Sequence, residues 1–130
     1  MTVRRPLLAA LAALAFAAGA CKPRPVVPGI TVQELKGRME RREKFVLLDV
    51  REPREYAKAK IEGSTLIPLG FLASRLGELD RSAKHVVHCK VGGRSASAVH
   101  LLREKGYDAV NLEGGIDEWS KSIDPSVPRY

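Results

Sequence analysis

Four short apolar runs, separated by stretches with helical spacing, most restrict what this chain can fold into. They read KFVLLDV, STLIPL, KHVVHC and AVNL. Runs this short and this uniformly apolar are typical of strands that are buried on both faces, as in parallel sheets. Parallel strands need crossover connections, which are usually helices packed on the two faces of the sheet. We therefore predict a single α/β domain with a mostly parallel central sheet and helices on both faces.

Helices are expected between these runs, and two of them carry clear end signals. Thr31 with Glu34 three residues later is a capping-box signature, which predicts a helix start at that point. Gly106 directly follows a long stretch with helical spacing and predicts the end of that helix. The expected helices cover residues 31–42, a short stretch after Pro53, residues 71–79, residues 94–105 and the segment GGIDEWSKSI.

The N-terminal segment MTVRRPLLAALAALAFAAGAC has the organisation of an export signal. A short basic start is followed by an apolar stretch over residues 7–18, too short to span a bilayer comfortably, and then by small residues. We assign residues 1–20 to a signal peptide. Ala18 and Ala20 fit a small-x-small cleavage site, whereas Ala18-Gly19-Ala20-Cys21 resembles the bacterial lipobox, so both kinds of processing stay open. We favour lipidation of Cys21.

The segment after this cysteine, KPRPVVPG, contains three prolines, which disfavour a helix and favour an extended tether over residues 21–29. The globular domain then covers residues 30–130. We expect an exported, membrane-anchored lipoprotein that faces the periplasm or the cell exterior, with a soluble periplasmic protein as the alternative. An unmodified Cys21 would be able to form a disulfide with Cys89, the second of the two cysteines, in an oxidising compartment.

Composition argues against one class of partner. Lys and Arg number 22 against 15 Asp and Glu, so the chain is basic with a net charge of +7. The densest cluster, RMERREKF, is interleaved with acids and has no aromatic platform, which is typical of a solvated helix face. We therefore expect no nucleic-acid partner, and we expect neither a metal site nor a cofactor.

The stretch HCKVGGRSASAVH, residues 88–100, contains the candidate catalytic residue. Cys89 ends an expected strand, and in parallel sheets ligands bind where strands end and loops lead into helices. The glycine pair after it lets successive amide groups point inward, and the helix start that follows adds its positive dipole end. The helix N-terminus and the nearby cations Lys90 and Arg94 lower the pKa of a thiol. The pattern predicts a nucleophilic sulfur, and an inert buried cysteine is the alternative.

The seven residues Cys-Lys-Val-Gly-Gly-Arg-Ser from Cys89 to Ser95 resemble the Cys-x-x-Gly-x-Arg-Ser active loop of the rhodanese family of sulfurtransferases. LLDVREPREY is similar to the family's Asp-x-Arg-x-x-x-Glu-[Tyr/Phe] segment, and LEGGIDEW is similar to its Gly-Gly-x-x-x-Trp ending. The likeness runs from Ile30 to Pro128 and is greatest to rhodanese domains fused behind adenylyltransferases that sulfurate small carrier proteins. In place of the family's Gly-His-Ile-Pro-Gly-Ala the chain has AKIEGS at 59–64, a change expected near the sheet edge that leaves catalysis intact.

The resemblance implies a rhodanese-like fold and a persulfide mechanism. Cys89 would take sulfane sulfur from thiosulfate or a persulfide and pass it to cyanide or to a thiol, including a protein thiol. Asp49 and Arg51 are expected to support the loop, while His88 and His100 are expected to be packing or surface residues. The residues expected to bind the donor or the persulfide are Lys90, Val91, Gly92, Gly93, Arg94 and Ser95, with Lys90 and Arg94 also expected to attract anionic donors.

Two rival functions use a similar loop. Cysteine-based phosphatases and arsenate reductases place five residues between the cysteine and the arginine, whereas four residues separate Cys89 from Arg94 here, which suits a single extra sulfur rather than a tetrahedral oxyanion. The second rival is a non-catalytic, membrane-tethered binding module of rhodanese fold, or a thiol-redox module. The complete loop favours catalysis over the second rival.

Overall fold

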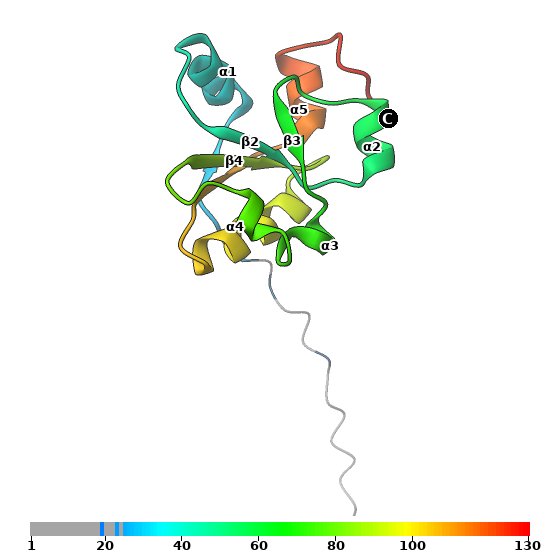
Figure 1. The fold of residues 1–130 in the computed structure, drawn as a ribbon. Helices are drawn as coiled ribbons and strands as arrows, with labels where there is room; N and C mark the ends of the chain where they lie inside the picture. Colours follow the sequence, from blue (N-terminus) through cyan, green and yellow to red (C-terminus); the bar gives the residue numbers. More distant parts are fainter. Residues whose placement is uncertain (1–18, 20–22, 24) are drawn as a thin grey trace, which may run out of the picture.

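A five-stranded parallel sheet forms the centre of the domain (Figure 1). The structure is a computed structural model that describes Gly19, Pro23 and residues 25–130. Every neighbouring pair of strands runs parallel, which confirms the predicted fold class. The strands are β1 (Gly29–Ile30), β2 (Val46–Asp49), β3 (Ser64–Leu66), β4 (Lys84–His88) and β5 (Asp108–Leu112), in the spatial order β1-β5-β4-β2-β3.

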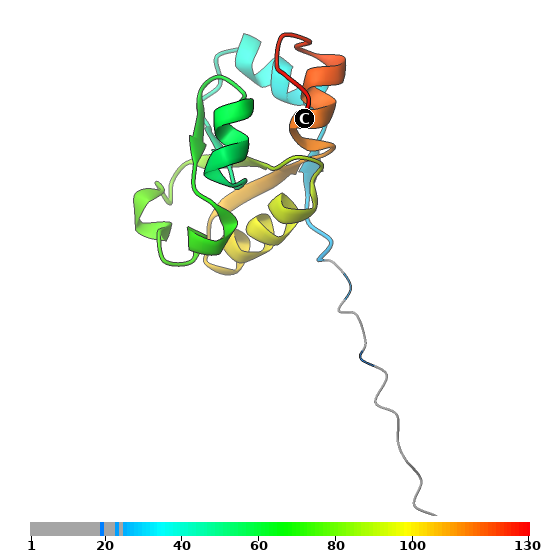
Figure 2. The ribbon, with the colours of Figure 1, turned by 90° about the vertical axis from the view of Figure 1, so that its right-hand side faces the viewer.

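Helices cover both faces of this sheet, as predicted. Figures 1 and 2 show α1 and α5 on one face and α3 and α4 on the other, while α2 flanks the edge near β3. Helix α1 starts at the predicted cap, because the Thr31 hydroxyl accepts the amide hydrogen of Glu34 at 3.1 Å. The helices are α1 (Val32–Glu40), α2 (Pro53–Lys58), α3 (Leu69–Leu72), α4 (Gly93–Glu104) and α5 (Gly115–Ser122).

The central strands are mostly apolar in their middle because their alternate residues enter two separate cores. Leu47 of β2 packs in the core beneath α1 and α5, together with Trp119. Leu48, the next residue, packs in the core beneath α3 and α4, together with Leu102. Successive side chains of a strand point to opposite faces, so a strand with a core on each side has few polar positions between its ends.

Two elements differ from the sequence-based expectation at the start of the domain. The two-residue strand β1 was not predicted, because it is too short to form an apolar run; Gly29 pairs with Asn111 and Ile30 pairs with Leu112 of β5. The predicted tether over residues 21–29 therefore ends inside the sheet. Helix α1 ends at Glu40, two residues before the predicted end, where the chain turns and Arg42 adopts a φ of 53°.

The single helix predicted over residues 71–79 is wrong. The segment instead contains the one-turn α3 and a short 3-10 helix, η1 (Leu76–Glu78). The hydroxyl of Ser74 donates to the carbonyl of Phe71 at 2.9 Å, and the amide of Arg75 bonds the carbonyl of Leu72 at 3.0 Å. Such local bonds compete with the bonds of a continuous α-helix and break it into tight turns.

The predicted signal peptide and the lipidation site at Cys21 lie outside the described residues, apart from Gly19. Within the described part of the chain, none of the helices combines the length and apolar character that crossing a bilayer requires.

Candidate active site

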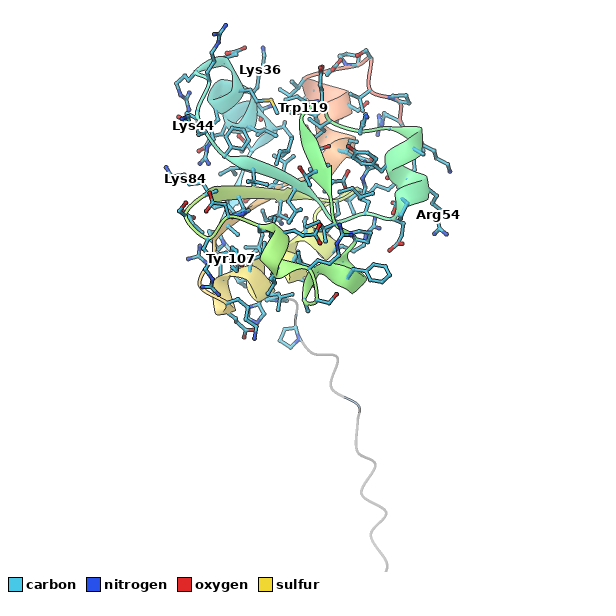
Figure 3. The ribbon with its side chains drawn as sticks, viewed as in Figure 1. Lys36, Lys44, Arg54, Lys84, Tyr107 and Trp119 are labelled. Carbon is cyan, nitrogen blue, oxygen red and sulfur yellow. The ribbon has the colours of Figure 1, made fainter. Side chains whose placement is uncertain are left out.

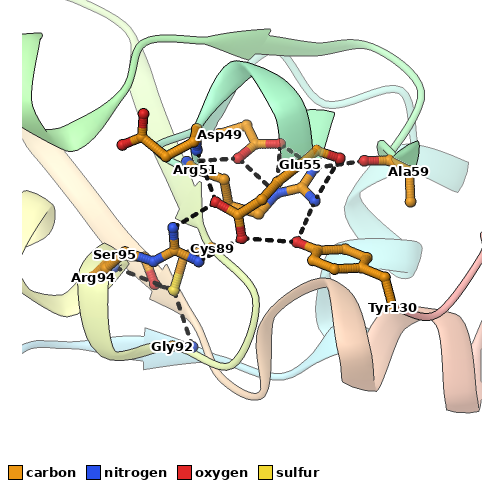
Figure 4. A network of polar contacts seen from close by, with 10 residues as sticks. Asp49, Arg51, Glu55, Ala59, Cys89, Gly92, Arg94, Ser95 and Tyr130 are labelled. Carbon is orange, nitrogen blue, oxygen red and sulfur yellow. Dashed lines mark hydrogen bonds and ion pairs between the residues drawn. The ribbon is translucent and has the colours of Figure 1, made fainter. Parts of the chain in front are cut away.

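Cys89 lies where β4 ends, one residue before the loop that leads into α4. Its Sγ accepts hydrogen bonds from the backbone amides of Gly92, at 3.1 Å, and Ser95, at 3.4 Å (Figure 4). The Ser95 hydroxyl lies 3.3 Å from the same sulfur. Gly92 adopts a φ of 110°, a conformation that favours glycine, and this turn brings its amide back to the cysteine. The loop thus surrounds the sulfur with donors.

The start of α4 leaves further donors unused at this place. The first four amides of a helix have no acceptor within the helix, and here these belong to residues 92–95 because Gly92 is the N-cap. Two of the four bond Sγ. The other two, from Gly93 and Arg94, have no hydrogen-bond acceptor among the residues that the structure describes, so they are left to bond an additional atom attached to the sulfur. Their number and position suit one extra sulfur with a negative charge.

The pKa of the Cys89 thiol is shifted by two opposing effects. Burial raises it, since only 1% of the residue is exposed. Hydrogen bonds from the Ser95 hydroxyl and from the amides of Ser95, Gly92 and Val91 lower it, and together they prevail, so the pKa lies below its ordinary value. The thiolate is the nucleophilic form of cysteine, and this environment increases its fraction at neutral pH.

Asn111 of β5 holds the Ser95 hydroxyl in place. Its Nδ2 donates to the carbonyl of Gly92 at 3.2 Å, which leaves Oδ1 as the acceptor for Ser95 Oγ at 2.5 Å. Ser95 is fully buried and Asn111 is 9% exposed, so water does not compete for these bonds. The hydroxyl proton of Ser95 therefore lies between two acceptors, Asn111 Oδ1 and the sulfur, whenever the sulfur is a thiolate.

Backbone amides at the N-terminus of α5 donate hydrogen bonds to the cysteine loop. The amide of Ile116 bonds the carbonyl of Cys89 at 2.9 Å, and the amide of Asp117 bonds the carbonyl of Lys90 at 3.1 Å. A Cβ on Gly115 would lie 2.5 Å from both of these carbonyl oxygens. The glycine pair of LEGGIDEW is therefore needed for this close approach between α5 and the loop.

Both cations of the loop are paired with carboxylates. Lys90 Nζ lies 2.9 Å from each carboxylate oxygen of Asp117. The Arg94 guanidinium bonds Glu55 of α2 through two contacts of 2.7 and 2.9 Å, as Figure 4 shows. These bonds from Arg94 lower the pKa of Glu55 to about 2 despite partial burial. The cations expected to attract anions thus have much of their charge neutralised within the fold.

Asp49 and Arg51 form a buried ion pair next to this network, and both side chains are 0% exposed. Arg51 Nη2 lies 2.7 Å from Asp49 Oδ2, and Arg51 Nη1 donates to the Tyr130 hydroxyl at 2.7 Å. The Tyr130 hydroxyl in turn donates to Glu55 at 3.0 Å, so the C-terminal residue connects the buried pair to the arginine of the loop. The pair therefore supports the loop through Tyr130 and Glu55, not by direct contact with the sulfur.

Neither histidine considered in the sequence bonds the sulfur. His88 is buried, and its Nε2 lies 3.7 Å from Asp49 Oδ2. Burial and the charge of Arg51 lower the pKa of His88, although Asp49 opposes this effect, so the ring is neutral at pH 7. His100 lies on the exposed side of α4, 3.2 Å from Glu104.

A cavity of about 340 Å³ opens onto the sulfur. Larger hollows, of about 400 to 460 Å³, lie elsewhere in the described part of the chain and are not lined by Cys89. Within residues 25–130 and the two isolated described positions, no cluster of three or more His, Cys, Asp or Glu side chains is arranged to hold a metal ion. The cavity at the sulfur is lined by Leu69, Cys89, Val91, Gly93, Arg94 and Ser97.

The sequence did not identify four residues that complete the site: Glu55, Asn111, Asp117 and Tyr130. Glu55 and Asp117 lie within LLDVREPREY and LEGGIDEW, so their segments were noted, but nothing in the sequence paired them with Arg94 and Lys90. Asn111 lies in an expected buried strand, where a lone polar residue is a signal that a hydrogen-bond partner is required. Tyr130 has no comparable signal.

The lowered pKa leads to a prediction about Ser95. Ser95→Ala removes the hydroxyl donor and is expected to raise the pKa of Cys89, which lowers the thiolate fraction at pH 7. Alkylation of Cys89 by iodoacetamide, followed by mass spectrometry from pH 5 to pH 10, should show a curve displaced to higher pH. Ser97→Ala is the matched control because Ser97 lines the cavity without bonding the sulfur. Coincident curves for wild type and Ser95→Ala would contradict the assigned role.

Comparisons with known proteins agree with this geometry. The family model described as Rhodanese-like domain matches residues 31–122. A protein of Mycobacterium tuberculosis named as the adenylyltransferase/sulfurtransferase MoeZ is 38% identical over 104 residues, covering 78% of this chain and 26% of that protein. This chain therefore spans about a quarter of the length of that relative.

A shorter relative and a solved structure match over most of their own length. A protein of Bacillus subtilis named as the sulfurtransferase YtwF is 33% identical over 96 residues, covering 74% of this chain and 93% of that protein. The crystal structure of a rhodanese-related protein from Thermoplasma volcanium superimposes with a TM-score of 0.70 at 35% identity, covering 78% of this chain and 97% of that one.

Proposed function

Because the chain belongs to the rhodanese-like domain family, and similar proteins are named sulfurtransferases, we propose that it transfers sulfane sulfur through a persulfide on Cys89. The observation that carries this proposal is the pair of unused amides, from Gly93 and Arg94, beside a sulfur whose pKa is already lowered. A site built only to bury a cysteine needs neither feature.

In the first half of the reaction, the Cys89 thiolate attacks the outer sulfur of a donor such as thiosulfate. A bond forms between Sγ and that sulfur, the donor's S–S bond breaks, and sulfite leaves with the bonding electron pair. The product is a persulfide anion on Cys89, whose charge is stabilised by the amides of Gly93 and Arg94. Since Cys89 is 1% exposed, the donor must present its outer sulfur through the cavity.

In the second half, an acceptor nucleophile attacks the terminal sulfur of the persulfide. The S–S bond breaks, the Cys89 thiolate is regenerated, and the acceptor leaves with the sulfur, as thiocyanate from cyanide or as a new persulfide from a thiol. We propose small sulfur-containing donors and a thiol acceptor, of a small molecule or of a protein, as the physiological partners. Neither half-reaction calls for a metal ion or an organic cofactor.

Mass spectrometry tests this proposal directly. Incubation of the reduced protein with thiosulfate should add about 32 Da, one sulfur, to the peptide that carries Cys89, and later addition of cyanide should remove that mass and release thiocyanate. Dithiothreitol should also remove it. An unchanged mass after treatment with both thiosulfate and a persulfide donor would refute the proposal.

We also propose that the domain acts outside the cytoplasm, on a lipid anchor at Cys21. The support is the sequence of residues 1–21, with its basic start, apolar stretch and lipobox-like end. Cys21→Ser should move the protein from the membrane fraction to the soluble periplasmic fraction and abolish the mass of the attached lipid. Identical fractionation of variant and wild type, with no lipid on either, would leave simple periplasmic release as the correct description.

A further inference from the structure

The electrostatics of the cavity beside Cys89 differ from those of a site built for a small dianion. Lys90 and Arg94 are the cations of the loop, and each is bonded through two contacts to a carboxylate, Asp117 and Glu55 respectively. A cation paired at 2.7 to 2.9 Å acts on a third charge as part of a dipole, and its attraction for an anion is much weaker than that of a free cation.

Other cations do not make up for this neutralisation. Lys44 and Lys84 lie near the N-terminal ends of β2 and β4, opposite the end that carries Cys89, and Lys36 lies on α1 (Figure 3). Arg54 is exposed on the outer side of α2 and does not line the cavity. Among the residues that the structure describes, none of the side chains lining the cavity is an unpaired cation.

Two large apolar side chains contribute to the rest of the cavity, beside Ser97. Leu69 and Val91 line it, and Val91 is 64% exposed. Phe71, in the same one-turn helix as Leu69, is 59% exposed. An exposed valine and a half-buried leucine in the lining give the pocket an apolar side, which suits a donor that carries an apolar group.

We infer that this site prefers sulfur donors in which the transferable sulfur is attached to an apolar group and carries at most one negative charge, over the dianion thiosulfate, and that Asp117 and Glu55 set this preference. The inference rests on the proposed function. With an organic thiosulfonate, the Cys89 thiolate attacks the terminal sulfur, the S–S bond breaks, and a sulfinate leaves with the electron pair. The products are one persulfide anion and one sulfinate anion from two singly charged reactants.

Three donors separate charge from apolar size: thiosulfate, methanethiosulfonate and benzenethiosulfonate. For each, kcat/KM with cyanide as acceptor is divided by the rate constant for the same donor with a free small thiol, which removes differences in intrinsic reactivity. On this scale wild type should favour benzenethiosulfonate over thiosulfate by at least about tenfold, because a dianion gains little from paired cations. Val91→Ser should lower the ratio of the benzenethiosulfonate value to the thiosulfate value, because it removes an apolar side chain that lines the cavity.

The decisive variant is Asp117→Asn, which leaves Lys90 without its carboxylate. It should raise kcat/KM for thiosulfate about fivefold to tenfold at low salt and change that for benzenethiosulfonate by less than about twofold, because a doubly charged donor gains more from a freed cation. Adding Lys90→Met to this variant should abolish the gain. Glu113→Gln is the matched control, since it removes an exposed carboxylate from the turn that precedes α5, and it should change neither value.

Two results would overturn the inference while leaving the proposed function intact: a normalised kcat/KM for thiosulfate equal to or above that for benzenethiosulfonate, or no response of thiosulfate turnover to Asp117→Asn. Failure of the proposed function has a different signature, because no donor would then add about 32 Da to Cys89. The mass measurement on wild type thus separates a wrong donor class from a wrong activity.

Discussion

A Cys89→Ser variant is expected to fold as the wild type does and to lose sulfur transfer. The serine hydroxyl fits the buried position and accepts the same amide hydrogens, but it is not ionised near neutral pH and does not form a persulfide. Removal of a covalent nucleophile commonly lowers turnover by factors of about 10⁴ to 10⁶, so thiocyanate production should fall at least about 10⁴-fold. No sulfur should be added to the variant by thiosulfate, as judged by intact mass.

The chain supplies a matched control for this experiment in its second cysteine. Cys21→Ser should retain full thiosulfate:cyanide turnover in detergent-solubilised or purified protein, because Cys21 is assigned to anchoring and not to chemistry. Thermal unfolding curves of both variants would establish that the loss is chemical and not structural. Turnover at the wild-type level in Cys89→Ser would exclude a Cys89 persulfide as the intermediate.

The parts of the fold that could be predicted from the sequence are those determined by local pattern. The strands β2 and β4 are apolar in their middle because each faces two cores, and Leu47 and Leu48 show this alternation. The helix ends at Thr31 and Gly106 carry their signals within a few residues. In contrast, β1 is too short for any pattern, and the continuity of α3 depended on bonds that Ser74 makes with its own neighbours.

The parts of the site that could not be predicted depend on pairs that are distant in the chain. Arg94 and Glu55 are separated by 39 positions, Lys90 and Asp117 by 27, and Arg51 and Tyr130 by 79. Periodicity and spacing contain no information about such pairs. The missing pairs matter for the chemistry of the site. Without Glu55 and Asp117, the sequence-based description treated Arg94 and Lys90 as free charges beside the thiol, whereas each is paired with a carboxylate in the fold.

The same distinction applies to the activation of Cys89. The sequence attributed a lowered pKa to the helix N-terminus and to the cations of the loop. In the structure the helix N-terminus acts through specific amides, from Gly92 and Ser95, and the Ser95 hydroxyl adds a further donor. The sequence therefore predicted the correct direction of the pKa shift of Cys89. It attributed the shift partly to causes other than those that the structure shows. Hydrogen bonds at 3.1 to 3.4 Å from the sulfur are the main cause of the lowering, although the charge of Arg94 also interacts with Cys89.

The largest loss of stability is expected from Arg51→Met. Arg51 and Asp49 are both 0% exposed, and Arg51 also donates to the carbonyl of Ala59 at 2.6 Å and to Tyr130 at 2.7 Å. Methionine fills much of the same volume but leaves the Asp49 carboxylate buried without its partner. Removing one member of a buried pair commonly costs about 3 to 5 kcal/mol, so the free energy of unfolding measured in urea should fall by about that amount.

Arg75→Met is the matched control, because Arg75 and Glu78 form an exposed pair of similar length, 2.6 Å, and its loss should lower the free energy of unfolding far less than the loss of Arg51 does. The loss in free energy of unfolding that Arg51→Met causes should also depend on pH. The reason is His88, whose Nε2 lies 3.7 Å from Asp49. Burial and the charge of Arg51 lower the pKa of His88 in the wild type, so removal of Arg51 raises that pKa and lets a protonated His88 pair with Asp49 at low pH. A group whose pKa rises in the folded state stabilises the protein below that pKa and loses this contribution as the pH increases through it. The difference in free energy of unfolding between Arg51→Met and wild type should therefore become smaller as the pH is lowered from 8 to 6. A difference that is constant with pH, or no larger than that of the control, would show that Arg51 does not compensate a buried charge on Asp49.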